Sequence, residues 1–194
     1  MATTGAEGER ASELATARLI LRPLMLEDWR EVHELAGDDE VARWTASLPH
    51  PMTEQDARRW VESRTHVITP TGIGHVFAVT RRDDGCLVGV AGFYVRSGTS
   101  SADLGYWFGR AYWNRGYAAE ALVAMLRFAF EGLHVAEAKA TAFPDNIASM
   151  RVLEKAGFRV TGRTNRDIPL RGGVREIVLC AVDKAAFFVA GQGK

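Results

Sequence analysis

The stretch Leu104-Gly-Tyr-Trp-Phe-Gly-Arg-Ala-Tyr-Trp-Asn-Arg-Gly-Tyr-Ala118 decides how the rest of this sequence is interpreted. Its apolar start predicts a strand buried on both faces, and residues 116–131 predict a helix, so a short basic turn joins the two elements. Amides at the start of a helix and its positive dipole end attract anions, and Gly116 and Ala118 leave room for a close approach. We therefore expect a phosphate-binding turn, to which Arg115 adds a positive charge. The alternative is that the glycine serves only a steric purpose.

Alternating and helical patterns predict further elements on both sides of this turn. Strands are expected at residues 18–23, 75–80, 86–95, 135–143, 158–163 and 174–182. Helices are expected around residues 29–36, at 38–45, after a capping box at 53–56, and at 146–156. Gly132 is expected to end its helix in a left-handed conformation, and Gly157-Phe158 predicts a Schellman-type cap.

Length and composition favour one domain. With 194 residues and 47% hydrophobic content, the chain can bury one substantial core. We assign residues 16–184 to a single domain, 1–15 to a disordered N-terminal tail and 185–194 to a frayed C-terminal tail. Basic and acidic residues both total 24, so the net charge is zero and neither nucleic acid nor a membrane is expected as a partner.

Neither export nor membrane insertion is expected. Residues 1–17 contain no apolar run, so they do not resemble a secretory signal. The longest apolar stretch, residues 121–130, is interrupted by Arg127 and is too short to span a bilayer. Cys86 and Cys180 provide no disulfide framework, which suits the reducing cytoplasm, and both are expected to be small core residues.

Four segments together resemble the GNAT N-acetyltransferases, and within them the ribosomal-protein alanine N-acetyltransferase-like subgroup. They are Thr16-Ala-Arg-Leu-Ile-Leu-Arg-Pro-Leu24, Ala102-Asp-Leu-Gly-Tyr-Trp-Phe108, Trp113-Asn-Arg-Gly-Tyr-Ala-Ala-Glu-Ala121 and Asn146-Ile-Ala-Ser-Met-Arg-Val-Leu-Glu-Lys-Ala-Gly-Phe158. The resemblance extends from Thr16 to about Val182. It implies an α/β (α+β) fold with a mixed, mostly antiparallel central sheet flanked by helices. Two splayed parallel strands, 104–108 and 135–143, would form the acetyl-CoA cleft.

The resemblance also implies where acetyl-CoA binds, with the amides of the turn holding its pyrophosphate. The implied cofactor contacts are Trp107, Phe108, Arg115, Gly116, Tyr117, Ala118, Asn146 and Ser149. Trp113 and Asn114 depart from the family pattern Gln/Arg-Gly-x-Gly-x-Gly/Ala. Asparagine tolerates a left-handed backbone, whereas a tryptophan at position 113 removes one polar phosphate contact. Asn146 and Ser149 are equally suited to capping the helix that they begin.

Acetyl transfer needs a neutral amine, a donor for the developing oxyanion and a proton for the thiolate. Asp103 is the candidate base, acting through a water, because relatives often have Glu at this place in a Glu-x-Gly-Tyr pattern. A solvated surface role is its alternative, and Asp167 and Glu176 are the other candidate carboxylates. A backbone N–H at the end of the splayed strand would meet the oxyanion. The tyrosine that commonly protonates the thiolate is replaced by Leu153, so Ser149 is the candidate acid, with a water or the proton of the incoming ammonium as the alternatives.

The acceptor side is less clearly marked in the sequence. His66 and His75 are candidates to face the acceptor, and Trp44, Trp60 and Trp107 either line its cleft or belong to the core. No residues have metal-ligand spacing, so no metal is expected. The acidic residues among 27–64 form either a lip that attracts a cationic amine or basic peptide, or a solvated helix face.

The predicted function is therefore transfer of acetyl from acetyl-CoA to a primary amine, foremost a protein or peptide amino terminus. The alternatives are a small amine, such as an aminoglycoside, polyamine or amino acid, and a non-catalytic CoA-binding module. The expected partners are acetyl-CoA and the amine acceptor, with a homodimer left open.

Overall fold

The computed structural model describes residues 13–65 and 68–191. Its strands are β1 (Leu14–Ala15), β2 (Leu19–Pro23), β3 (Ile68–Thr69), β4 (Gly72–Arg81), β5 (Leu87–Arg96), β6 (Ser101–Phe108), β7 (Glu137–Ala142), β8 (Arg159–Ile168) and β9 (Gly173–Asp183). Its helices are α1 (Trp29–Ala36), α2 (Asp39–Ala42), α3 (Glu54–Thr65), α4 (Tyr117–Glu131), α5 (Ile147–Lys155) and α6 (Lys184–Gly191). Three short 3-10 turns are η1 (Leu26–Asp28), η2 (Arg110–Tyr112) and η3 (Pro169–Arg171).

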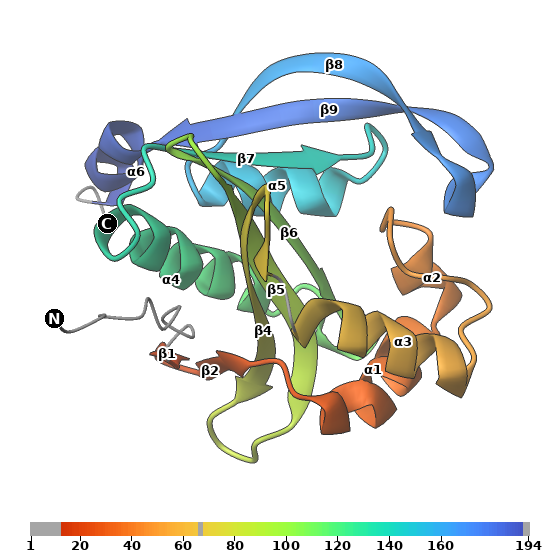
Figure 1. Ribbon diagram of the computed structural model, residues 1–194. Coiled ribbons are helices and arrows are strands. Elements are labelled where there is room, and N and C mark those ends of the chain that lie inside the picture. The colour runs from red at the N-terminus through yellow and green to blue at the C-terminus, as the bar shows by residue number, and fades with distance from the viewer. Residues whose placement is uncertain (1–12, 66–67, 192–194) are drawn as a thin grey trace, which may run out of the picture.

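These strands form one sheet in the order β1-β2-β4-β5-β6-β7-β9-β8, with β3 pairing along β4. Every neighbouring pair is antiparallel except β6 and β7 (Figure 1). The α/β fold with a mixed, mostly antiparallel sheet flanked by helices is thus confirmed. The His66 prediction and residues 1–12 of the expected N-terminal tail lie outside the described residues.

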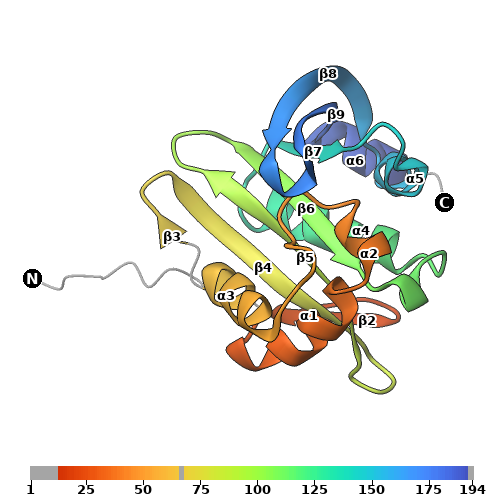
Figure 2. The same ribbon diagram turned by 90° about the vertical axis from the view of Figure 1, so that its right-hand side faces the viewer.

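Helices cover both faces of the sheet, which explains why its central strands are almost continuously apolar (Figures 1 and 2). Alternate residues of β4 belong to different cores: Phe77 lies in the core that includes the apolar face of α4, and Ala78 lies in the core beneath α1 and α3. A third, small cluster joins Phe143, Ile168 and Ile177 at the β8–β9 hairpin.

The parallel strands β6 and β7 separate part-way along their length. They pair from Ser101 opposite Glu137 to Leu104 opposite Ala140, after which β6 continues to Phe108 and β7 to Ala142 with no pairing between them. The splayed strands expected from the resemblance are therefore present. Every second residue of β7 is a buried alanine: Ala138, Ala140 and Ala142. Because these side chains are small, the gap between β6 and β7 remains open.

Helix ends follow the sequence signals in two places and depart from them in one. Thr53 and Asp56 exchange backbone-to-side-chain hydrogen bonds of 3.1 Å as a capping box. Gly157 has φ +90°, and the Phe158 N–H donates to the Leu153 carbonyl at 3.0 Å, as a Schellman cap requires. Gly132, however, has φ −85° and extends α4 by donating to Phe128, so the prediction of a left-handed cap there was wrong.

Both ends of the domain are more ordered than the sequence suggested. Leu14–Ala15 pair with β2, although residues through 15 were assigned to a tail. The expected frayed tail from residue 185 instead continues α6, where Phe187 is buried against Phe130 with ring centroids 5.4 Å apart. Cys180 is buried as expected, but Cys86 is exposed because it follows the tip of the β4–β5 hairpin.

Candidate active site

A cavity of about 1010 Å³ lies where β6 and β7 separate. Strands β4 to β7 contribute to its lining. The turn before α4 and the start of α5 line one half of it, which we call the cofactor half. The loop after α2, the end of α3 and the β8–β9 hairpin line the other half, which we call the acceptor half. One continuous space thus joins the expected phosphate turn to the helices on the opposite face of the sheet.

The turn before α4 has the backbone that an anion site needs. Gly116 is the N-cap of α4 with φ +80°, and Asn114 has φ +59°, so the asparagine adopts the left-handed conformation expected of it. No side chain caps the helix, which leaves the first amides of α4 available. Glycine is required at position 116 because a side chain is strained at this φ and its Cβ would also lie 3.4 Å from Arg18 Nη2.

Residues at the chain's start hold this turn in place. Arg18 donates to the Arg115 carbonyl at 3.0 Å and to Glu120 through Nε at 2.7 Å. Thr16 Oγ1 donates to the other Glu120 oxygen at 2.6 Å. Burial alone would raise the pKa of Glu120, but the hydrogen bonds from Thr16 and Arg18 outweigh it and lower the pKa below its usual value. Glu120 therefore remains an anion that ties the segment between β1 and β2 to the first turn of α4.

Trp113, which departs from the family pattern, has a structural role. Its indole Nε1–H donates to the Phe108 carbonyl at 2.7 Å, joining the turn to the end of β6. The Arg115 side chain is exposed and does not line the cavity, whereas its carbonyl is the group that Arg18 holds. The other residues implied as cofactor contacts, which are Trp107, Phe108, Gly116, Tyr117, Ala118, Asn146 and Ser149, all line the cavity.

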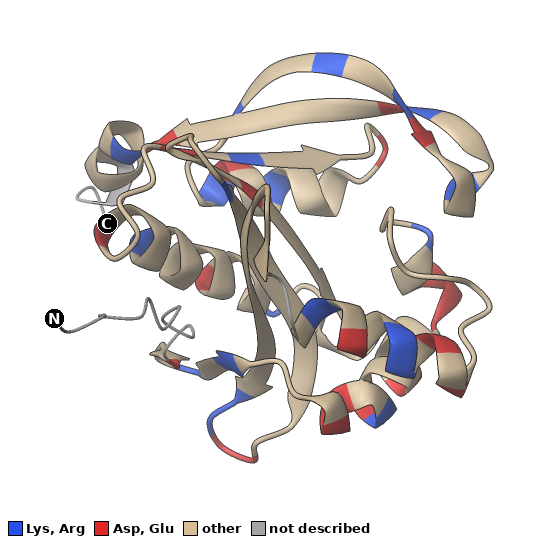
Figure 3. Ribbon diagram, in the orientation of Figure 1, with Lys and Arg blue, Asp and Glu red and all other residues tan. Residues whose placement is uncertain are grey.

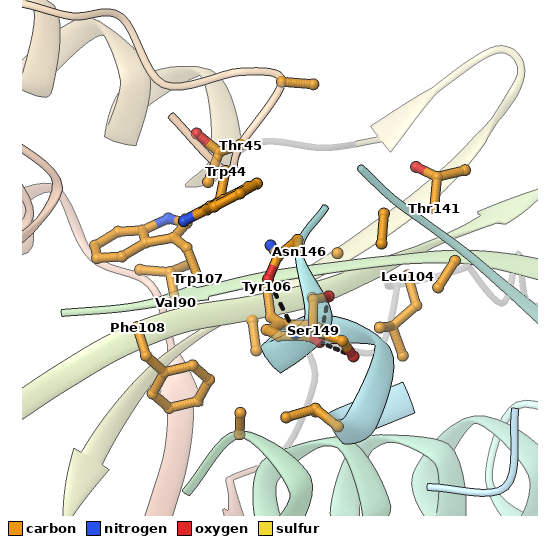
Figure 4. A pocket seen from close by; sticks show the side chains of 18 of the residues that line it. Trp44, Thr45, Val90, Leu104, Tyr106, Trp107, Phe108, Thr141, Asn146 and Ser149 are labelled. Carbon is orange, nitrogen blue, oxygen red and sulfur yellow. Dashed lines mark hydrogen bonds between the residues drawn. The ribbon is translucent and has the colours of Figure 1, made fainter. Parts of the chain in front are cut away.

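At the start of α5, Ser149 meets a tyrosine that the sequence analysis did not select. Ser149 Oγ lies 2.9 Å from Tyr106 Oη, and the Asn146 side chain accepts from the Ser149 N–H at 3.0 Å as the N-cap of α5 (Figure 4). Burial raises the pKa of Tyr106 to about 12, although its hydrogen bond with Ser149 opposes the shift. The phenol is therefore a protonated donor at neutral pH. Leu153, at the place of the common tyrosine acid, is a buried core residue.

Asp103 is the only one of the three candidate carboxylates that lines this cavity among the residues described. It lies on the opposite face of β6 from Tyr106, and its side chain is 42% exposed. Arg96 pairs with it at 2.6 Å. Asp167 and Glu176 both lie outside the cavity lining, on the exposed hairpin, where Glu176 pairs with Arg163 at 3.4 Å.

Comparison with known proteins supports the same assignment of the fold. A family model described as an acetyltransferase (GNAT) domain matches residues 18–159. The chain belongs to the GNAT acetyltransferase family. Similar proteins include the uncharacterized N-acetyltransferase YnaD of Bacillus subtilis (strain 168), which is 33% identical over 157 residues that make up 80% of this chain and 88% of YnaD.

Solved structures of GNAT proteins have the same architecture. An acetyltransferase of the GNAT family from Bacillus anthracis superposes with a TM-score of 0.78 at 28% identity, covering 90% of this chain and 99% of that one. The ribosomal-protein-S5-alanine acetyltransferase of Vibrio fischeri reaches a TM-score of 0.72 at 16% identity, covering 91% and 99%. The second likeness is one of fold alone. Membership of the family makes this chain an acetyltransferase with acetyl-CoA as its acetyl donor.

In this GNAT fold the acceptor half is lined by aromatic residues and glycine. Trp44, Trp60 and Trp107 all line the cavity, and the rings of Trp60 and Trp107 meet edge to face with centroids 6.0 Å apart. Figure 4 shows the indoles of Trp44 and Trp107 on the same side of the Tyr106–Ser149 pair. Between Asp103 and Trp107 on this face of β6 lies Gly105, where an added Cβ would meet no atom within 4 Å. The glycine leaves a hollow beside the Asp103 carboxylate.

One expectation for the acceptor side was wrong. His75 is 7% exposed and packs between Phe93 and Phe128 on the α4 face of β4, because its neighbours Gly74 and Val76 are the residues that face the cavity. Burial lowers the pKa of His75, so it is a neutral core residue. The acidic residues of 27–64 fit the alternative of a solvated helix face, because none of them lines the cavity. Glu40 and Glu54 pair with arginines three or four residues away. Figure 3 shows acidic residues along α1, α2 and α3.

Two searches of the described residues were negative. No group of three or more histidine, cysteine or carboxylate side chains could hold a metal ion there. In the same residues, no helix is both long and apolar enough to span a membrane.

Proposed function

We propose that this chain transfers the acetyl group of acetyl-CoA to a primary amine that enters the acceptor half of the cavity. The observation that carries the proposal is the continuity of one cavity from the left-handed turn at Gly116, past the Tyr106–Ser149 pair, to Asp103. A cleft with an anion site at one end and proton-transfer groups at its centre fits a phosphate-bearing thioester that reacts with an amine.

The residues of the cofactor half fit acetyl-CoA. The first amides of α4 would hold the pyrophosphate, and Tyr117 and Ala118 border that position. The pantetheine arm would lie in the gap between β6 and β7, beside Trp107 and Phe108. The Asn146 oxygen caps α5 by accepting from the Ser149 N–H, and the NH₂ group of the same side chain is free to donate to the arm.

The protein's own groups supply the proton transfers. Acetyl-CoA supplies an activated acetyl group, and the C–S bond breaks as the C–N bond forms. Asp103, acting through a water, would take the proton that the ammonium loses, and a backbone N–H near Phe108 would donate to the acetyl oxygen. Ser149 would give its proton to the leaving sulfur and be held in position by Tyr106, whose phenol remains protonated.

Two acceptor classes are compatible with this chemistry. A protein or peptide amino terminus, of the ribosomal-protein-alanine type, is what the resemblance of the four segments implies. A small amine is favoured by the lining of the acceptor half, because the acidic residues expected to attract a basic peptide lie outside it. The unpaired state of Cys86 and Cys180 is consistent with a reaction in the reducing cytoplasm.

The test of this proposal is thiol release from acetyl-CoA by the purified chain with a broad amine panel. The panel contains free amino acids, polyamines, aminoglycosides, and peptides with free Ala or Ser amino termini and either basic or acidic sequences. Amine-dependent thiol release and mass-spectrometric detection of an N-acetyl product are the expected results. Binding of acetyl-CoA with no amine-dependent release across the panel would contradict the proposal.

A further inference from the structure

The acceptor half of the cavity has an excess of positive charge. Arg64 at the end of α3 and Arg166 on β8 both line it. The only carboxylate in the lining, among the residues described, is that of Asp103, which Arg96 already neutralises. A cavity built for a purely cationic amine would be expected to present unpaired carboxylates, so this distribution points to a different acceptor.

Arg64 is partly buried and lacks a counter-ion. Its guanidinium lies 4.2 Å from the Trp60 ring centroid and donates to Ser63 Oγ at 2.6 Å, but no carboxylate pairs with it in residues 13–65 or 68–191. Burial lowers the pKa of Arg64, which shows that its surroundings disfavour the charge. The Trp60 ring and Ser63 offset part of the desolvation cost, and an anionic ligand would supply the opposite charge that Arg64 lacks.

On the other side of the acceptor half, the β8–β9 hairpin places like charges opposite each other. Arg166 is directly across the ladder from Arg175, an arrangement that destabilises a hairpin unless an anion lies nearby. Arg175 donates to the Arg171 carbonyl at 3.2 Å and lies over the Phe143 ring. Arg171 in turn donates to the Ala42 carbonyl at 2.6 Å, which fixes the hairpin against the loop after α2. The exposed side chain of Arg166 has neither an ion pair nor a hydrogen bond within the described part of the chain.

We propose that the acceptor is a small amine that also carries a carboxylate, such as a free amino acid, and that Arg64 binds that carboxylate while Arg166 adds positive charge from the other side of the acceptor half. This inference rests on the proposed acetyltransferase function. A guanidinium group binds a carboxylate in planar, paired hydrogen bonds, so a ligand bound this way would give the partly buried Arg64 the anionic partner that it lacks. The ammonium end of the same molecule would lie toward Asp103, in the hollow above Gly105. Trp44 supplies an aromatic wall for an apolar side chain.

The proposal predicts different rates for acceptors that differ only in whether they carry the carboxylate. Each of several free amino acids is compared with its amide and with the corresponding decarboxylated amine, by kcat/KM for thiol release from acetyl-CoA. Loss of charge-assisted hydrogen bonds to the carboxylate should lower kcat/KM by roughly 10- to 100-fold for the amide and the amine. Peptides with free amino termini should be no better than the amides, because they also lack the adjacent carboxylate.

Matched variants assign the effect to the two arginines. Arg64→Gln and Arg166→Gln should each lower kcat/KM for the amino acid and leave kcat/KM for its amide nearly unchanged. Arg59→Gln, on the exposed face of α3, and Arg163→Gln, on β8 beside Glu176, are the controls and should leave the preference intact.

Two results would overturn this proposal while leaving the acetyltransferase function standing. One is equal or faster acetylation of the amide, the decarboxylated amine or a peptide. The other is a carboxylate preference that survives both arginine substitutions. Absence of acetylation with every amine would instead contradict the proposed function itself.

Discussion

The two halves of the cavity are built in different ways. In the cofactor half, backbone conformations define the site: Gly116 and Asn114 have positive φ, and Arg18 and Glu120 fix the turn through hydrogen bonds. In the acceptor half, side chains from the end of α3, the loop after α2 and the β8–β9 hairpin meet across the space. Sites made by backbone conformation tolerate little substitution and sites made by side chains tolerate much, so we expect changes of ligand to arise in the acceptor half.

Asp103→Asn tests the acceptor half with the largest expected effect. Loss of the carboxylate that we propose as the acceptor of the amine's proton should lower kcat by roughly 100-fold or more, the usual scale for a general base. The affinity for acetyl-CoA should change little, because Asp103 lies on the opposite face of β6 from Ser149 and the start of α5. The low-pH limb of the rate profile should also change, since the variant lacks the proposed base.

Glu176→Gln and Asp167→Asn are the matched controls for this prediction. Both change a hairpin carboxylate that lies outside the cavity lining, so both should keep near wild-type turnover. Wild-type kcat in Asp103→Asn, together with a loss in either control, would move the base to the hairpin.

Gly116→Val tests the cofactor half. A β-branched residue at φ +80° is strained by about 1–3 kcal/mol and places its side chain toward Arg18, so acetyl-CoA affinity should fall by roughly 10- to 100-fold. Calorimetric titration with acetyl-CoA measures the loss. Gly85→Val is the matched control, because Gly85 has φ +72° in the β4–β5 hairpin and an added Cβ there meets no atom. A variant of normal melting temperature with unchanged acetyl-CoA affinity would refute the phosphate site at this turn.

The sequence was most informative where local backbone geometry determines the site. A strand, a glycine-containing turn and a helix are contiguous in the chain, so their pattern alone predicted the turn before α4, which lines the cavity. Two of the four recognised segments proved to be one structural unit, because Thr16 and Arg18 bind Glu120 more than a hundred positions later. That contact joins residues that are far apart in the sequence. Local sequence patterns do not show which distant residues meet in the fold, so the contact could not be predicted.

The sequence was least informative where side chains from separate elements meet. His75 was expected near the acceptor, but the register of β4 turns it toward α4, and a shift of one residue would reverse that orientation. Tyr106 was overlooked because its partner Ser149 lies 43 positions away. The available signal was alternation along β6, which places Tyr106 on the same face as Leu104 and Phe108, opposite Asp103. Alternation along a strand predicts on which face of the sheet a side chain lies, but it does not predict which helix covers that face.

Tyr106→Phe has the smallest expected effect and connects the two halves. Removal of the Tyr106 hydroxyl takes away one hydrogen bond to Ser149. This loss should lower kcat by roughly 2- to 10-fold and leave the acetyl-CoA affinity nearly unchanged. Because the pKa of Tyr106 is raised to about 12, its phenol is protonated throughout the accessible pH range, so the effect should not vary between pH 7 and about pH 10. Tyr112→Phe, which changes another tyrosine of the cavity lining, is the control and should have turnover close to that of the wild type.

A double-mutant cycle distinguishes positioning from direct proton donation by Tyr106. If Tyr106 acts only by holding Ser149 Oγ toward the sulfur, Tyr106→Phe should have no further effect in a Ser149→Ala background. If the two losses in kcat multiply instead, the phenol acts on the reacting atoms independently of the serine. If neither variant lowers kcat, the leaving sulfur takes its proton from another source, such as water or the incoming ammonium, and the Tyr106–Ser149 pair serves only to join β6 to the start of α5.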